Sequence, residues 1–422
     1  MEARVFLRAK ILSLAARARR LGRMSHASVG IRPQDLPYAP PLAHFRAANE
    51  RLAAIDAQVN RRFVELRRIW RTASTDRVLL DIALVEREID RARRAWGLFF
   101  EVFGQRGSDV APVLAAHDVI AADCYAAARA AVPGLFRGTM LGPLTYMDHG
   151  FSPVTWRRGV QLSRLLGEAN PFPLIRIPWD RDNPWQAVFL HEVVHNLQAD
   201  LGIWQENKVA VQTRLARASG DPVLTQIYGG WHKEIFADLG ALLLGGPAAA
   251  WGLAEFLAHP APRAMTFRPG GPHPTGVIRV LILAEMLHRM GFRADGARLA
   301  RVWRRLYDPR RIDRLPARLV STAPRLIPAV VDEIAFQTRR NLAQHALADV
   351  IPFRLRDEEA IRGVARRLAA GHQPPADLPP RHLVSAASYA LASGRVSPRL
   401  LAKHVVARLT DQRVPVPMAL AA

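Results

Sequence analysis

The sequence contains a single cysteine, Cys124, among 422 residues. One thiol excludes an intrachain disulfide, and it also excludes a zinc site built from several cysteines. The chain can nevertheless bury a sizeable core, because half of its residues are hydrophobic and 23% are charged. Since nothing in this composition requires an oxidising compartment, we expect a cytoplasmic protein.

Lysine is also scarce, although Lys and Arg together outnumber Asp and Glu by 59 to 37 and give a formal net charge of +22. An excess of positive charge made almost entirely of arginine is as typical of a coding bias as of a binding surface. No basic run alternates with aromatic residues, as a binder of single-stranded nucleic acid requires. We therefore expect no specific nucleic-acid partner, and a basic nucleic-acid-binding protein is the weakest alternative.

Long hydrophobic runs are missing as well. The longest charge-free apolar run near the centre, residues 239–254, contains four glycines and one proline and is shorter than the ~20 residues that a bilayer requires. In the basic N-terminal segment, residues 1–35, charges are scattered among the apolar residues, unlike in a signal peptide. We expect no membrane-spanning helix. Peripheral contact of this segment with an anionic membrane is the alternative.

Helical periodicity dominates the sequence on both sides of its centre. Residues 36–104 contain two amphipathic segments separated by a break near Ser74, which predicts an antiparallel helical hairpin. The apolar residues of the second segment follow a spacing of three and four: Ile82, Val85, Ile89, Ala92, Trp96, Phe99 and Phe103. We expect the hairpin to serve packing, with a dimer interface as the alternative. Residues 292–422 form a predicted helical, arginine-rich region without a catalytic motif.

Two short segments of the central region, residues 144–147 and 174–177, are typical of strands. Prolines on both sides of the second segment predict that it lies at the edge of a sheet, because proline cannot donate to a neighbouring strand. The fold class predicted for the chain is therefore mainly α (α+β). A core with a small edge-stranded sheet over residues 105–291 lies between the hairpin and the C-terminal helical region.

Within this core, residues 183–202 read NPWQAVFLHEVVHNLQADLG. The pattern predicts one helix over the whole segment, because Asn-Pro at its start and glycine at its end are typical helix boundaries. His191 and His195 lie four residues apart, so both imidazoles leave the same helical face and can bind one metal ion. Glu192 stands beside them as the remaining defined position of a His-Glu-x-x-His motif.

A catalytic zinc ion needs a third protein ligand and an open position for water. One class of zinc peptidases, the metzincins, takes this ligand from a histidine six residues after the motif and has a glycine midway. Those positions are Leu201 and Gln198 here, so the third ligand must come from a carboxylate farther along.

Glu234 is the best candidate for that carboxylate. It shares a helical face with Asp238, four residues later, in a segment that continues as an apolar run. This arrangement suits one carboxylate that binds the metal and a second one that orients a histidine. Glu206 and Asp200 are the weaker alternatives.

A third motif reads His-Pro-x-x-x-x-Arg and places His273 just before a predicted helix that starts at Pro274 and stops before Gly291. Arg279 lies about one and a half turns inside this helix. The plain alternative is a histidine that caps the helix and an arginine on its surface.

Taken together, the motifs at 191–195, 234–238 and 273–279 resemble the gluzincin peptidases of the CAAX prenyl endopeptidase and HtpX type. The resemblance covers residues 190–290, less than a third of the chain. It implies a zincin-like core. Two departures from the family mean that its substrate cannot be assigned to this chain. Many members are integral membrane proteins, whereas we expect no membrane-spanning helix here. In addition, Leu239 stands where those proteins often carry a basic residue.

The resemblance also implies a role for each motif residue. One Zn²⁺ ion per chain is bound by His191, His195 and Glu234, while Glu192 acts as the general base. Asp238 orients a ligand, His273 stabilises the oxyanion and Arg279 supports the site.

We therefore predict a zinc-dependent metalloendopeptidase, a hydrolase that cleaves peptide or protein substrates by means of a metal-activated water. The alternative is a zinc-stabilised helical scaffold or regulator that has lost its hydrolytic activity. An intact Glu192 argues against it, because a structural site has no need of a carboxylate between its ligands. The sequence does not indicate cleavage specificity or oligomeric state.

Overall fold

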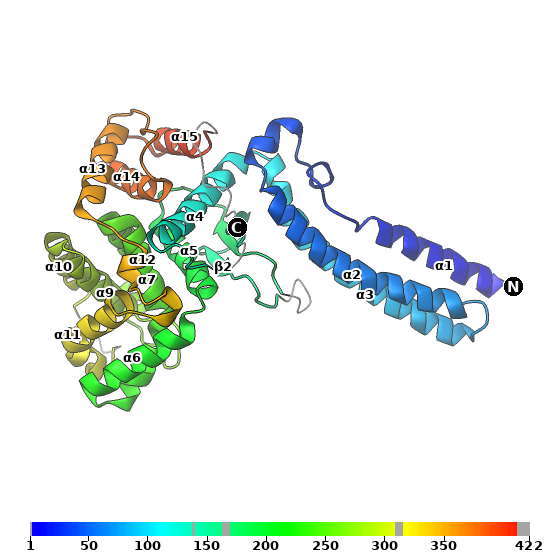
Figure 1. Ribbon diagram of the computed structural model, residues 1–422, viewed down its shortest axis with the longest axis horizontal. Coiled ribbons are helices and arrows are strands. Elements are labelled where there is room, and N and C mark those ends of the chain that lie inside the picture. Colours follow the sequence, from blue (N-terminus) through cyan, green and yellow to red (C-terminus); the bar gives the residue numbers. More distant parts are fainter. Residues whose placement is uncertain (1, 137–139, 163–168, 309–314, 412–422) are drawn as a thin grey trace. The chain divides into compact units, whose positions relative to one another are not determined.

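The structure, a computed structural model, describes residues 2–136, 140–162, 169–308 and 315–411 (Figure 1). The protein is mainly helical with one small sheet, so the predicted fold class is confirmed. Two compact units can be distinguished. The first comprises residues 1–115, 144–147 and 156–174, and the second comprises residues 116–143, 148–155 and 175–422.

The first unit contains the N-terminal helices. They are α1 (Glu2–Arg19), η1 (Ala27–Val29), η2 (Pro33–Tyr38), α2 (Leu42–Ile69), α3 (Thr75–Gly104) and η3 (Gln105–Gly107). In Figure 1, α2 and α3 lie side by side as an antiparallel pair. The Ser74 hydroxyl caps α3 by accepting a hydrogen bond from the Arg77 amide.

Of the seven residues predicted for the buried face of α3, all except Trp96 are buried. Trp96 is only half-buried, and Ala95 and Leu98 are fully buried instead. The three-four spacing marks only a narrow stripe, whereas the buried face of a helix in a protein is wider and here includes Ala95 and Leu98.

Helix α1 packs against this hairpin and buries Leu7, Ile11 and Leu14. Its Arg4 side chain donates hydrogen bonds to the backbone carbonyls of Trp70 and Ala73, at the end of the hairpin where α2 and α3 are joined. The N-terminal helix is therefore attached to the hairpin by both apolar and polar contacts.

The sheet has three strands, β1 (Leu144–Asp148), β2 (Val154–Trp156) and β3 (Leu174–Pro178), in the order β1-β3-β2. The prediction that residues 174–177 form an edge strand is wrong, because β3 is central. Pro173 precedes β3 and its carbonyl accepts a hydrogen bond from Leu144, and Pro178 is the last residue of the strand, so proline stands only at the ends of β3. No sequence pattern predicted β2, which is only three residues long.

The second unit is a helical assembly around α7. Its helices, together with α4, which begins in the first unit, are α4 (Ala111–Ala131), α5 (Ala187–Asp200), α6 (Trp204–Ser219), α7 (Pro222–Leu257), α8 (Ala261–Ala264), α9 (Gly276–Arg289), α10 (Arg293–Leu306), α11 (Ala317–Val331), η6 (Asp332–Phe336), η7 (Arg340–Leu342), α12 (Leu347–Val350), α13 (Leu355–Ala369), α14 (Pro380–Ala392) and α15 (Pro398–Leu409). Helices α5, α6, α9 and α14 all pack against α7. The helices after residue 291 therefore share a core with the predicted metal-binding segments.

Helix α7 is long and apolar enough to cross a membrane by length and composition. The expectation that this region is too short was wrong, because the apolar run belongs to a helix of 36 residues. However, 89% of its most apolar 18-residue window is buried inside the protein, as in the core helix of a globular assembly. Gly246, with φ of 64°, and Pro247 interrupt the helix within this window.

Two glycines let α5 approach α7 closely. A β-carbon on Gly240 would lie 2.6 Å from a methyl carbon of Val194, and one on Gly245 would lie 2.9 Å from a methyl carbon of Leu190. Neither position therefore has room for a side chain. This close contact brings the histidines of α5 next to the carboxylates of α7.

Candidate metal centre

The two histidines of the motif lie one turn apart on α5, which starts at Ala187 instead of the predicted Pro184, three residues later. Asn183 does not cap it, and its carbonyl instead accepts a hydrogen bond from Gln186 in a preceding turn. Gly202 ends the helical segment with φ of 63°, as expected. Both imidazoles leave the face that meets α7, and their Nε2 atoms are 3.1 Å apart.

Glu234 completes this group from α7. Its Oε2 lies 3.5 Å from Nε2 of His191, and its Oε1 lies 3.3 Å from Nε2 of His195. The prediction that two imidazoles and this carboxylate converge is confirmed. Among the residues that the structure describes, this is the only group of at least three His, Cys, Asp or Glu side chains close enough to hold one metal ion.

The spacing of these donor atoms suits a small tetrahedral ion. In a tetrahedral site with bonds of ~2.0–2.1 Å, neighbouring ligand atoms are about 3.3–3.4 Å apart. The two Nε2 atoms are 3.1 Å apart, and the nearest carboxylate oxygens of Glu234 lie 3.5 Å from His191 (Oε2) and 3.3 Å from His195 (Oε1). The group His191, His195 and Glu234 could therefore hold a metal ion without rearrangement of the two helices.

A buried ion pair between Asp238 and Arg279 lies next to the metal-binding group. Oδ1 of Asp238 lies 2.9 Å from Nδ1 of His191, within hydrogen-bonding distance. Arg279 of α9 donates two hydrogen bonds to the same carboxylate, Nε to Oδ2 at 2.8 Å and Nη2 to Oδ1 at 2.6 Å. Since both charged groups are buried, the alternative of a surface arginine is wrong. This pairing orients His191 so that its Nε2 faces the other two donor atoms.

The charges of the centre are coupled. Burial opposes ionisation of Glu234, but hydrogen bonds from His191 and His195 outweigh it and hold the pKa of Glu234 well below its usual range. Burial also opposes the charged form of His191, yet Asp238 and Glu234 together raise its pKa to about 9. In the metal-free protein at neutral pH, His191 therefore carries a proton that a metal ion must displace.

One side of the centre is open to solvent. The His273 side chain is 61% exposed, and its Nε2 lies 3.5 Å from Oε1 of Glu234. The His195 side chain is 17% exposed, whereas that of His191 is 5% exposed. His273 does not cap the following helix, which starts at Gly276 instead of Pro274, because Thr275 accepts the capping hydrogen bond from Ile278. His273 is thus free to face a molecule bound at the centre.

Glu192 is held between the motif histidines but does not belong to the metal-binding group. Its backbone carbonyl accepts a hydrogen bond of 2.8 Å from the Thr155 hydroxyl of β2. The negative charge of the Glu192 side chain is one of the nearby charges that raise the pKa of Arg279. Sequence reasoning missed Thr155, because a strand as short as β2 leaves no periodic signal.

The two alternative ligands are occupied elsewhere. Asp200 accepts a hydrogen bond of 2.8 Å from the Tyr125 hydroxyl. Glu206 accepts hydrogen bonds from the backbone amides of Arg340 and Asn341. Neither carboxylate belongs to the metal-binding group described here.

The site can thus be compared with known proteins only through its geometry and motifs. No protein-family model, no curated protein and no solved structure matches this chain.

Proposed function

We propose that the protein is a zinc-dependent metallopeptidase. The observation that carries this proposal is the convergence of the Nε2 atoms of His191 and His195, 3.1 Å apart, with the carboxylate of Glu234, whose oxygens lie 3.3–3.5 Å from them. Two histidines and one glutamate are a ligand set of catalytic zinc sites, which keep a fourth position open. Calcium and magnesium prefer six or more oxygen ligands, which this group does not offer.

Zinc, when bound, lowers the pKa of water toward ~7 and polarises a carbonyl group as a Lewis acid. Glu192 follows the first ligand directly and can accept the proton of the attacking water and pass it to the leaving amine. His273, exposed beside Glu234, can donate a hydrogen bond to the developing oxyanion. Asp238 and Arg279 do not reach the substrate, and they position His191.

The choice of a peptide bond as the substrate rests on the resemblance of the three motifs to gluzincin peptidases. The solvent-exposed side at His273 supports it, since a polypeptide must reach the centre from outside. We infer neither a cleavage specificity nor a preference for chain ends.

A second candidate is a metal-stabilised scaffold without hydrolytic activity. The observation in its favour is that the centre links α5 and α7 inside the core of the second unit, where a bound ion also stabilises the fold. The position of Glu192 between the ligands favours the hydrolase.

The deciding experiment compares two variants. We expect Glu192→Gln to retain one zinc ion per chain but to lower cleavage of a degenerate peptide library by about 10²–10⁴-fold. We expect His195→Ala to lose both the metal and the activity. Metal content is measured by elemental analysis and cleavage by mass spectrometry, with and without a chelator.

Full turnover by a pure Glu192→Gln preparation would refute the mechanism. If the wild-type protein binds one zinc ion and gains thermal stability but cleaves no peptide in the library, the scaffold is favoured instead.

A further inference from the structure

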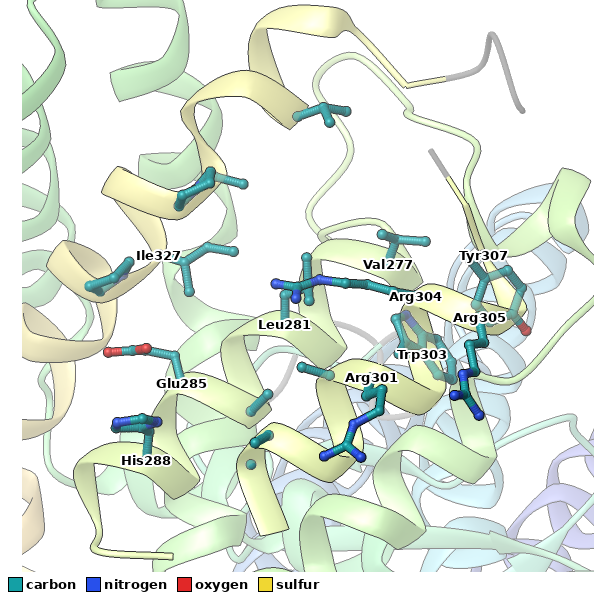
Figure 2. A pocket seen from close by; sticks show the side chains of 18 of the residues that line it. Val277, Leu281, Glu285, His288, Arg301, Trp303, Arg304, Arg305, Tyr307 and Ile327 are labelled. Carbon is teal, nitrogen blue, oxygen red and sulfur yellow. The ribbon is translucent and has the colours of Figure 1, made fainter. Parts of the chain in front are cut away.

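A second hollow region lies in the same unit, between α9, α10 and α11 (Figure 2). It is an open groove with a volume of about 930 Å³, near the upper end of the range of small-molecule sites. No residue of the metal centre lines it. The groove is therefore separate from the metal centre, and any function that it has must follow from its own lining residues.

Helix α9 separates the groove from the metal centre. Val277, Leu281 and His288 line the groove, whereas Arg279 points to Asp238. At roughly 100° per residue, the three lining residues lie within about 20° of the direction opposite to Arg279. The groove and the metal centre thus use opposite faces of one helix.

The floor of the groove is apolar and made largely of small or aliphatic side chains. Alanines at 300 and 323 leave space between the helices, and Leu281 and Ile327 supply aliphatic surface. An extended peptide would bring amide groups that find few partners on such a floor, whereas a hydrocarbon chain brings none. The floor therefore favours an aliphatic ligand.

The positive charge of the groove is concentrated on one wall. Arg301, Arg304 and Arg305 of α10 line it, and their spacing puts them on neighbouring positions of one helical face. In Figure 2 the Arg304 side chain extends across the groove above Leu281. Within the described part of the chain, no carboxylate lies within ion-pair distance of these three arginines.

Two carboxylates also line the groove. Glu285 stands on α9 and pairs at 3.0 Å with Arg289, which does not line the groove. Asp308 follows the end of α10. The α10 wall is therefore the part of the groove that attracts an anion.

We propose that this groove binds a free single-chain carboxylate amphiphile of the fatty-acid class. The hydrocarbon chain lies on the floor of α9 and α11, and the carboxylate accepts hydrogen bonds from Arg304. Neither the metal centre nor the proposed peptidase activity is needed for this binding, so each can fail without the other.

The test uses the full-length protein and dodecanoate below its micelle-forming concentration, with binding measured by calorimetry. We expect one dodecanoate per chain. Arg304→Gln should weaken binding about tenfold or more. Ala300→Leu should weaken it, because the longer side chain occupies part of the apolar floor. Dodecanol, which has the same chain without the charge, should bind at least about tenfold more weakly.

The matched control is Arg298→Gln on the same helix. The Arg298 guanidinium stacks over Trp251 at 5.6 Å and does not line the groove, so dodecanoate binding should stay unchanged. Circular dichroism confirms that each variant is folded.

The proposal is overturned if folded wild-type protein binds no dodecanoate, or if Arg298→Gln weakens binding as much as Arg304→Gln. It is also overturned if Arg304→Gln abolishes binding to phosphatidylglycerol vesicles while free dodecanoate does not bind. That last result would assign the arginines to a membrane surface.

Discussion

Helices α3 and α7 are the longest helices of their respective units, with 30 and 36 residues, yet they are built in opposite ways. Helix α3 buries one largely apolar face, as its spacing predicts, and Asp81 is its only buried charged residue. In α7 every residue from Glu234 to Ala250 is buried, including two carboxylates. Burying a carboxylate is unfavourable unless it is paired. The buried residues of α7 thus include carboxylates of the candidate metal centre, whereas the buried face of α3 serves packing.

The strongest test of this contrast removes one charge from α7. Asp238→Asn leaves Arg279 buried without its main partner, and we expect the free energy of unfolding to fall by about 3–5 kcal/mol. Metal affinity should fall about 10–100-fold, because His191 loses the group that orients it. Chemical denaturation and a zinc titration measure the two effects.

The matched change in α3 is Glu88→Gln, which breaks the ion pair with Arg91 at 3.2 Å. We expect a loss of only about 0.2–1 kcal/mol and no change in metal affinity. Equal losses in the two helices would contradict the contrast.

A second test uses glycine. Gly240→Ala puts a β-carbon 2.6 Å from Val194, and we expect a loss of about 1–3 kcal/mol together with weaker metal binding, because α5 and α7 must separate. Gly97→Ala in α3 meets no atom within 4 Å and should stabilise the protein by about 0.5–1 kcal/mol. Thermal unfolding of both variants reveals the opposite signs. A stabilising Gly240→Ala would show that the two helices are not in tight contact.

The third and smallest test uses pH. The pKa of His191 in the metal-free fold is about 9, above the ordinary value of 6.5. Its protonation therefore stabilises the metal-free fold below pH 6.5, and this contribution is lost as the pH rises through about 9. Since zinc displaces this proton, its affinity should rise about tenfold per pH unit, or ~1.4 kcal/mol, between pH 7 and 9.

Zinc titrations in two buffers of different ionisation enthalpy should count close to one proton released per ion bound at pH 7. Zinc uptake without proton release at this pH would contradict a charged His191.

The fold could be predicted wherever burial follows a simple period. The hairpin and the apolar face of α3 follow from spacing alone. The strand order could not be predicted, because prolines are typical of edge strands, whereas here Pro173 and Pro178 stand at the two ends of a central strand. Helix starts were misplaced near Asn183 and Pro274, since Gln186 and Thr275 take the cap positions instead.

The candidate site was predictable because its ligands follow helical spacing. His191 and His195 are four apart, as are Glu234 and Asp238, so each pair shares a face. The hydrogen bond between Thr155 and Glu192 could not be predicted, because it depends on the tertiary packing of β2 against α5. The groove beside α9 could not be predicted either, because its lining comes from three helices whose packing cannot be read from the sequence.

The pairing of Asp238 with Arg279 has a consequence for the valence of the ion that the centre accepts. Glu192, Glu234 and Asp238 contribute three negative charges and Arg279 one positive charge, which leaves a sum of −2 when both histidines are neutral. A divalent cation brings this sum to zero. A monovalent ion would leave the interior anionic, and a trivalent ion would leave it cationic. By reducing the sum of the charges from −3 to −2, Arg279 would favour a doubly charged ion at this centre.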